Sequence, residues 1–224
     1  MPQYRHEWKH EINGLDMHML RPRLRAVMEL DAHAKDGKYE VRSLYFDNWQ
    51  DKALMEKING INFREKFRLR CYNGNTSFIL LEKKSKINGL CKKEQQRLSL
   101  EEVKALISHK GELLPAENKP LLQELQFKMR IQGLNPKTIV DYTREAFVYG
   151  PGNVRVTLDY NIRTEICGTD FLNADCVTVP AGSPLAVLEV KWDEFLPSVI
   201  RDIIQLKGRR SAAFSKYAAC RIYG

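Results

Sequence analysis

One segment, FREKFRLRCY at positions 63–72, limits what this chain can fold into more than any other part of it. Successive side chains of a β-strand point to opposite faces of a sheet, so one face of this segment carries Arg64, Lys66, Arg68 and Arg70. The opposite face is mostly apolar and can join a hydrophobic core. Because like charges on one strand face repel each other, these neighbouring cations are expected to face an anion.

Four other segments alternate charged and uncharged side chains in the same way, namely YRHEWKHEI (4–12), ILLEKKSK (79–86), VRVTLDYNIRT (154–164) and LAVLEVKWD (185–193). The polar face of the third segment is expected to consist of Arg155, Thr157, Asp159, Asn161 and Arg163. A solvent-facing surface usually mixes both signs of charge with uncharged polar residues. These strands therefore predict either a barrel with charged faces inward and helices over its apolar outside, or an open basic sheet.

Helix signals lie between and after these strands. We expect helices over residues 20–30, 50–57, 99–108, 119–131, 194–206 and 211–220, the third of them beginning at a capping box of Ser99 and Glu102. No internal repeat, low-complexity tract or flexible linker interrupts the chain, so we expect one domain over residues 1–224.

The overall charge and composition indicate what kind of partner the protein binds and in which compartment it is expected. A net charge of +8 indicates an anionic partner. Nucleic acid is not expected, because Phe63, Phe67 and Tyr160 fall on the strand faces opposite the charge and could not stack on bases. No apolar run approaches the roughly 18–20 residues that span a bilayer, and the charged N-terminus lacks the apolar stretch of a signal peptide. We therefore expect a soluble cytoplasmic protein, with its five scattered cysteines reduced.

Read in order, several short motifs resemble a known family. They are RHEWKHEI, VRSLYFDN, FREKFRLRCY, LLEKKSK, VDYTREAFVY, VRVTLDYNIRT, AVLEVKW and FSKY. Together they resemble the polyphosphate polymerase domain of the vacuolar transporter chaperone (VTC) family, which belongs to the triphosphate tunnel metalloenzymes. The resemblance runs from Tyr4 to Tyr217. It implies an α+β fold, an antiparallel eight-stranded β tunnel barrel with helices packed on the outside.

The resemblance also implies roles for particular residues. The tunnel cations that bind the triphosphate and the growing chain would be Lys9, Arg68, Arg70, Lys84, Arg144, Arg155, Lys191 and Lys216. Further substrate contacts would come from Arg42, Arg64, Lys66 and Lys93. Glu189 would hold Mn²⁺ or Mg²⁺, with Glu7 and Glu82 as neighbours that could share the ion. One departure favours the VTC branch over efficient triphosphate hydrolysis: Arg5 stands where many tunnel metalloenzymes begin with a glutamate.

The activity implied by the resemblance is transfer of the γ-phosphate of ATP, or of another nucleoside triphosphate, to inorganic polyphosphate. No P-loop or Gly-rich kinase loop is present, so side chains would have to hold the phosphates. Two other hypotheses remain open. One is a triphosphatase or nucleotidyl cyclase of the same fold, and the other is a non-catalytic polyphosphate or anion binder. Transport of the product would require a separate membrane protein, and the sequence leaves the metal, the acceptor and the oligomeric state open.

The turn after the arginine-rich strand gives a prediction about register. A two-residue turn at Asn73-Gly74 would send Lys84 to the face opposite Arg68. The tunnel requires Arg68, Arg70, Glu82 and Lys84 on one face. We therefore expect a three-residue loop over positions 73–75, or a bulge, with asparagine in the left-handed conformation.

Overall fold

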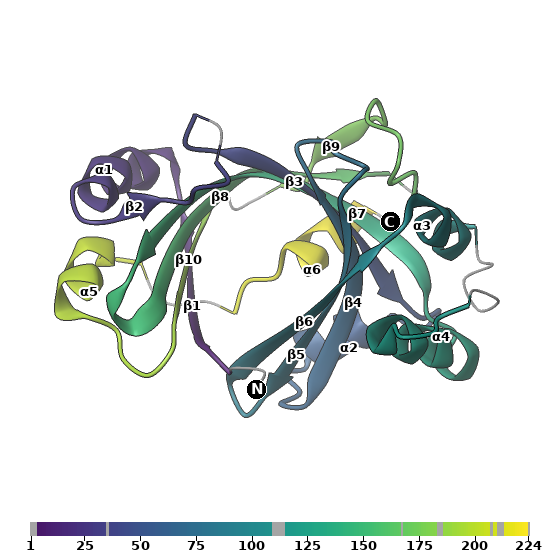
Figure 1. Cartoon of the computed structure of the whole chain (residues 1–224). Coiled ribbons are helices and arrows are strands. Elements are labelled where there is room, and N and C mark those ends of the chain that lie inside the picture. The colour runs from purple at the N-terminus through teal and green to yellow at the C-terminus, as the bar shows by residue number, and fades with distance from the viewer. Residues whose placement is uncertain are drawn as a thin grey trace.

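One antiparallel sheet curls into a barrel, and most of the helices lie against its outside (Figure 1). The computed structural model describes residues 4–34, 36–108, 115–166, 168–182, 186–206, 208–209 and 213–223. The short helix α6 (Lys216–Cys220) is the exception to the outer arrangement, since it lies within the ring of strands. Its Tyr217 is buried and stacks on Tyr45 of the barrel wall.

Neighbouring strands in the sheet follow one path around the barrel. In order, they are β1 (His6–Ile12), β10 (Ala186–Trp192), β8 (Val154–Glu165), β7 (Asn135–Tyr149), β3 (Tyr39–Asp47), β4 (Arg64–Tyr72), β5 (Ile79–Ile87) and β6 (Leu90–Leu98). Two short strands lie off this path: β2 (Glu29–Leu30) pairs with β7, and β9 (Thr178–Pro180) pairs with β8. All of these pairs are antiparallel, as expected.

The two edge strands of this path meet at one isolated antiparallel bridge among the described residues. There the backbone N–H of Arg5, just before β1, donates to the carbonyl of Cys91 in β6 at 3.0 Å, and the reverse bond is 3.1 Å. Among the described residues this bridge is the only backbone link between β1 and β6, so the sheet curls round without a closing ladder, whereas continuous ladders hold the rest of the wall. The predicted α+β fold with an eight-stranded antiparallel tunnel is confirmed.

The helices agree in number and order with the sequence prediction but differ in their ends. They are α1 (Gly14–Arg25), α2 (Lys52–Ile58), α3 (Leu100–Ile107), α4 (Pro120–Gln132), α5 (Ser198–Ile204) and α6, with short 3₁₀ turns at Pro151–Asn153 and Arg221–Tyr223. The predicted capping box of Ser99 and Glu102 is present. Helix α1 begins six residues earlier than expected, because Asn13 and Asp16 form a second capping box. The expected start of the last helix, at residues 211 and 212, lies outside the described residues.

Two apolar cores lie on the outer side of the barrel wall. On one side, Phe67 and Leu81 of the wall pack with Leu122 of α4. On the other side, Val156 packs with Ile200 of α5. Each fully buried side chain of this size contributes about 1.5–3 kcal/mol to folding. Since the outward faces of the strands supply these cores, the alternate charged side chains are directed into the barrel.

The β4–β5 connection confirms one expectation and corrects another. Arg68 pairs directly with Glu82, so the predicted common face for the charged residues of the two strands is confirmed. The predicted three-residue loop is wrong, because residues 73–78 connect the strands. Asn73 adopts the expected left-handed conformation, and its side chain accepts a hydrogen bond from Glu40 N. A local turn then lengthens the loop, as Asn75 accepts hydrogen bonds from the backbone and side chain of Ser77.

The alternation expected for β8 breaks at Asn161. This residue has a left-handed backbone (φ 52°), and the register between β7 and β8 shifts beside it. After the shift, Ile162 packs in the same cluster as Tyr217 of α6, and Arg163 binds Thr178 of β9. The expected placement of Asn161 and Arg163 on the charged face with Arg155 is therefore wrong.

Two further expectations concern the chain as a whole. No described helix has both the length and the apolar character needed to cross a membrane. The four described cysteines are free thiols, and Cys71, Cys91 and Cys220 are buried. The fifth, Cys167, lies outside the described residues.

Candidate functional site: the charged tunnel

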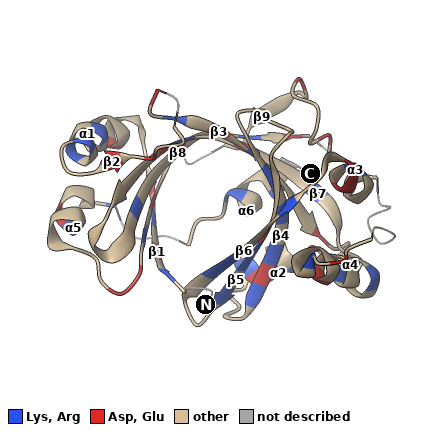
Figure 2. Cartoon of the chain, in the orientation of Figure 1, with Lys and Arg blue, Asp and Glu red and all other residues tan. Residues whose placement is uncertain are grey.

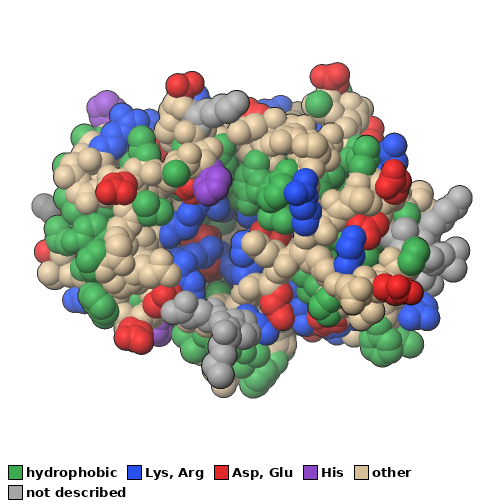
Figure 3. All heavy atoms as spheres, viewed as in Figure 1, with side chains coloured by type: hydrophobic (Ala, Val, Ile, Leu, Met, Phe, Trp, Pro, Cys, Tyr) green, Lys and Arg blue, Asp and Glu red, His purple; other side chains and the backbone are tan. Residues whose placement is uncertain are grey.

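Charged side chains from the strands and from α6 converge on the inside of the barrel. Eight are cations, namely Lys9, Lys66, Arg68, Arg70, Lys84, Arg144, Lys191 and Lys216, and four are carboxylates, namely Glu7, Glu82, Asp159 and Glu189. Figure 2 shows Lys and Arg along β4, β5 and β6 at the opening and on α6 within it. Figure 3 shows a hollow at the centre of this face in which Lys and Arg gather. The bore therefore carries an excess of positive charge.

Five of these residues form a lysine–carboxylate cluster contributed by β1, β5 and β10. Lys9 Nζ lies 3.0 Å from Glu7 Oε1 and 3.4 Å from Glu189 Oε2. Lys84 Nζ lies 2.6 Å from Glu7 Oε2, and Lys191 Nζ lies 2.6 Å from Glu189 Oε1. Burial alone would raise the pKa of Glu189, but the lysines hold this pKa well below its usual range. Both carboxylates are therefore ionised at neutral pH.

A second cluster surrounds Glu82 on β5. Arg68 contacts Glu82 Oε2 through Nε at 2.8 Å and NH2 at 2.6 Å, and Arg70 NH1 lies 3.7 Å from the same oxygen. Lys93 of β6 lies 3.2 Å from Glu82 Oε1, with its side chain half exposed. The structure thus places Glu82 beside arginines. It does not lie with Glu7 and Glu189, the two other carboxylates named as possible metal ligands.

A third cluster centres on Asp159, a fully buried residue to which the sequence assigned no role. Its carboxylate accepts hydrogen bonds from Arg144 at 2.6 and 2.7 Å, and Lys216 Nζ of α6 lies 2.5 Å away. Burial would raise the pKa of Asp159, but Arg144 and Lys216 lower it to about 2. Its position on the charged face of β8 was visible in the sequence, and Lys216 was expected in the tunnel, but the pairing of the two was not predicted.

Two expected cations lie toward the ends of the bore. Arg155 forms an ion pair with Asp31 and donates a hydrogen bond to Tyr39 Oη at 2.9 Å. The carboxylate of Asp31 also accepts a hydrogen bond from His33. Arg64 shares the inward face of β4 and donates to the carbonyl of Ile61. Neither side chain is grouped with a tunnel carboxylate, so both are free of the three clusters.

Arg42 is the one expected substrate contact that the structure does not bring to the tunnel. It lies on the other face of β3 from Tyr45, where its NH2 is 2.8 Å from Asp141 Oδ2 and its NH1 donates to the carbonyl of Asn173. The neighbouring outward residue, Leu44, belongs to the outer core. The expectation that Arg42 contacts substrate is therefore wrong for this arrangement.

Tyr45 adds a phenol to the arginine side of the tunnel. It is buried, its Oη accepts a hydrogen bond from Arg68 NH1 at 2.7 Å, and Lys66 Nζ lies 5.2 Å from the centre of its ring. Burial would raise the pKa of Tyr45, but Arg68, Lys66 and Arg70 together lower it to about 7. Burial also lowers the pKa of Lys66, to about 8, with Tyr45 opposing the change.

This pKa predicts a pH-dependent contribution of Tyr45 to stability. Because the folded-state pKa lies below the value of an exposed tyrosine, the stabilisation is complete only above pH 10 and is lost as the pH falls through about 7. In the absence of ligand, the excess unfolding free energy of wild type over Tyr45→Phe should grow between pH 7 and 10, by at most about 1.4 kcal/mol per pH unit. Urea unfolding of both proteins across this range measures it, and a constant difference would contradict the assignment.

The tunnel carboxylates can be compared with the needs of a divalent metal. Among the described residues, no group of three or more His, Cys, Asp or Glu side chains is arranged to hold an ion alone. Mg²⁺ is commonly held by one or two carboxylates together with substrate phosphates and water. Glu7 and Glu189 both form ion pairs with Lys9. They would fit that pattern if their lysines moved to the phosphate groups of a bound substrate.

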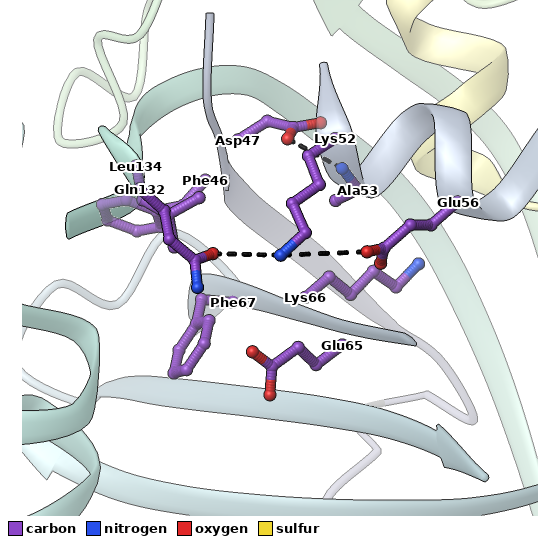
Figure 4. A pocket seen from close by; sticks show the side chains of 10 residues that line it. All are labelled: Phe46, Asp47, Lys52, Ala53, Glu56, Glu65, Lys66, Phe67, Gln132 and Leu134. Carbon is purple, nitrogen blue, oxygen red and sulfur yellow. Dashed lines mark hydrogen bonds and ion pairs between the residues drawn. The ribbon is translucent and has the colours of Figure 1, made fainter. Parts of the chain in front are cut away.

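A pocket lies beside the charged bore, between α2 and the end of α4, and shares Lys66 with it (Figure 4). Phe46 and Phe67, which line it, belong to the outer core. One of its two lysines, Lys52, has its Nζ 3.2 Å from Gln132 Oε1 and 3.9 Å from Glu56 Oε1. Its other lysine, Lys66, is one of the tunnel cations, and Glu65 of the lining pairs with Lys83.

Comparison with known proteins gives one family and a shared fold. No curated protein sequence matches the chain. Among solved structures, it is similar to a candidate adenylate cyclase from Bacillus halodurans, at 12% identity and a TM-score of 0.53, covering 84% of this chain and 80% of that one. It is also similar to a candidate adenylyl cyclase from Hippeastrum, described as having a dominant triphosphatase activity, at 14% identity and a TM-score of 0.53, covering 98% and 96%.

These two likenesses concern the fold, which they share with the chain over most of its length. The family is shown by sequence, since residues 4–222 match the sequence model described as the VTC domain. It includes every strand of the tunnel and α6. The chain therefore belongs to the VTC domain family.

Proposed function

We propose that this chain is a metal-dependent polyphosphate polymerase, which transfers the γ-phosphate of ATP or another nucleoside triphosphate to a growing polyphosphate chain inside the tunnel. The observation that carries the proposal is the charge of the bore, in which eight buried or partly buried cations face four carboxylates. A linear polyanion balances such an excess along its whole length. The family match supports the same choice of substrate class.

The arginines and lysines of the bore suit different parts of this task. Phosphoryl transfer depends mainly on positioning and on cations placed where negative charge develops. Guanidinium groups such as those of Arg68 and Arg144 stay ionised and bind two phosphate oxygens at once, whereas lysines act as point charges. Arginines would therefore fix the reacting phosphate, and lysines such as Lys66 would guide a chain that moves.

The transfer itself needs no covalent bond to the protein. An oxygen of the terminal phosphate of the acceptor forms a bond to the γ-phosphorus. The bond from that phosphorus to its bridging oxygen breaks, and the nucleoside diphosphate leaves with the electron pair. Glu189 and Glu7 would hold Mn²⁺ or Mg²⁺ beside the reacting phosphates, where such an ion neutralises charge on phosphate oxygens.

A triphosphatase is the second candidate function, because water can replace the polyphosphate acceptor without any change in the cations. The described activity of the Hippeastrum protein favours this candidate through the shared fold. Arg5, where a glutamate would supply another metal ligand, favours the polymerase, since it pairs with Asp193 and supplies no carboxylate.

Product analysis separates these functions. Purified protein incubated with ATP and Mn²⁺ is expected to form long polyphosphate and ADP, visible as a ladder on a polyacrylamide gel. Excess chelator should abolish the product, and Glu189→Gln should lower it sharply, because a carboxylate beside the phosphates is lost. Orthophosphate without polymer would support the triphosphatase, and binding of tripolyphosphate without any turnover would support a non-catalytic anion binder.

A further inference from the structure

A buried hydroxyl group without a partner lies in the wall of the tunnel. Thr157 on β8 is 2% exposed, and its Oγ1 has no hydrogen-bond partner among the described residues. Another buried threonine of the same strand differs, since Thr164 Oγ1 donates to the carbonyl of Ile139 at 2.8 Å. A buried hydroxyl that bonds to nothing destabilises the folded protein, so its retention needs an explanation.

The strand pattern directs this hydroxyl into the bore. Thr157 alternates with Val156 and Leu158, which pack in the outer core. It therefore shares a face with Arg155 and with Asp159, which is paired with Arg144 and Lys216 inside the barrel. The unpartnered group thus lies between two charged positions of the tunnel wall.

The neighbours of Thr157 across the sheet offer it no partner. On one side it pairs in register with Glu189 of β10, and both oxygens of that carboxylate are occupied, one by Lys191 and the other by Lys9. On the other side it pairs with Ala146 of β7, which has no polar side chain. No described protein atom therefore supplies a partner for this hydroxyl.

We propose that Thr157 Oγ1 is a substrate-binding group that donates a hydrogen bond to a phosphate oxygen held beside Glu189. The inference rests on the proposed function and names a contact within the same tunnel. A phosphate oxygen is a strong acceptor, and hydrogen bonds to charged acceptors are about twice as strong as neutral ones. A neutral donor at this point binds the phosphate without adding another positive charge beside Lys191 and Lys9.

Two substitutions at this position separate binding from structure. Thr157→Val keeps the shape and removes the hydroxyl, whereas Thr157→Ser keeps the hydroxyl. By calorimetric titration with inorganic tripolyphosphate, Thr157→Val is expected to bind about 10-fold or more weakly than wild type, and Thr157→Ser within about 3-fold of it. Without ligand, the melting temperature of Thr157→Val should be equal to or above that of wild type, because an unsatisfied group is removed.

Thr164→Val is the matched control, from the same strand and equally buried. Its hydroxyl has a partner in the protein, so this variant should melt at a lower temperature and bind tripolyphosphate as wild type does. Equal binding by Thr157→Val and wild type, or a lower melting temperature of ligand-free Thr157→Val, would overturn the inference. Failure of wild type to bind tripolyphosphate would instead refute the proposed function.

Discussion

Asp159→Asn is expected to lower the free energy of unfolding by about 3–5 kcal/mol, the largest effect on stability that we predict. Asp159 is fully buried and forms ion pairs with both Arg144 and Lys216. Asparagine has nearly the same shape but carries no charge, so two buried cations would share no anion. Removing one member of a buried ion pair is far more destabilising than replacing the whole pair with apolar residues, because it leaves a buried charge without a partner.

Urea unfolding of wild type and variant measures this loss. Asp141→Asn is a suitable control, because Asp141 also pairs with an arginine but is partly exposed, so its loss should be about 1 kcal/mol or less. Inorganic tripolyphosphate should raise the melting temperature of Asp159→Asn more than that of wild type, since the bound anion can replace the missing charge. If the unfolding free energy of Asp159→Asn fell no more than that of the control, Asp159 would not be the anion that stabilises Arg144 and Lys216.

The charged inner wall could be predicted from sequence because its signal is local. In β4, a run of cations at every second position leaves an apolar alternate face, and this pattern requires one side in a core. The common face of Arg68 and Glu82 was predicted from the family resemblance, which requires both side chains inside the tunnel. The length of their connecting loop did not follow, because it depends on the hydrogen bonds of Asn75 with Ser77.

Other features depended on contacts between distant parts of the chain. In β3, buried residues occur on both faces, among them Val41 and Leu44, so alternation gives no direction for Arg42, whose partner Asp141 lies far along the sequence. The shift at Asn161 required a left-handed residue opposite an irregularity in β7, which composition does not reveal. The entry of α6 into the barrel, which brings Lys216 to Asp159, likewise depends on tertiary packing.

Arg68→Ala is expected to have the largest effect on binding. Arg68 combines an inward position on β4, contact with Glu82 and a hydrogen bond to Tyr45. Losing one hydrogen-bonded contact with a charged partner weakens binding by about 1.5–3 kcal/mol, which corresponds to roughly 10- to 150-fold in the dissociation constant. Glu82 keeps Arg70 and Lys93 in the variant, so the fold should persist.

Arg42→Ala provides the comparison, because Arg42 is also an arginine paired with a carboxylate but faces the outside of the same wall. Calorimetric titration of inorganic tripolyphosphate into wild type, Arg68→Ala and Arg42→Ala compares an inward with an outward cation directly. If a phosphate chain binds inside the barrel, only Arg68→Ala loses affinity, by roughly 10- to 150-fold. Equal losses in the two variants, or no loss in Arg68→Ala, would contradict a phosphate-binding tunnel.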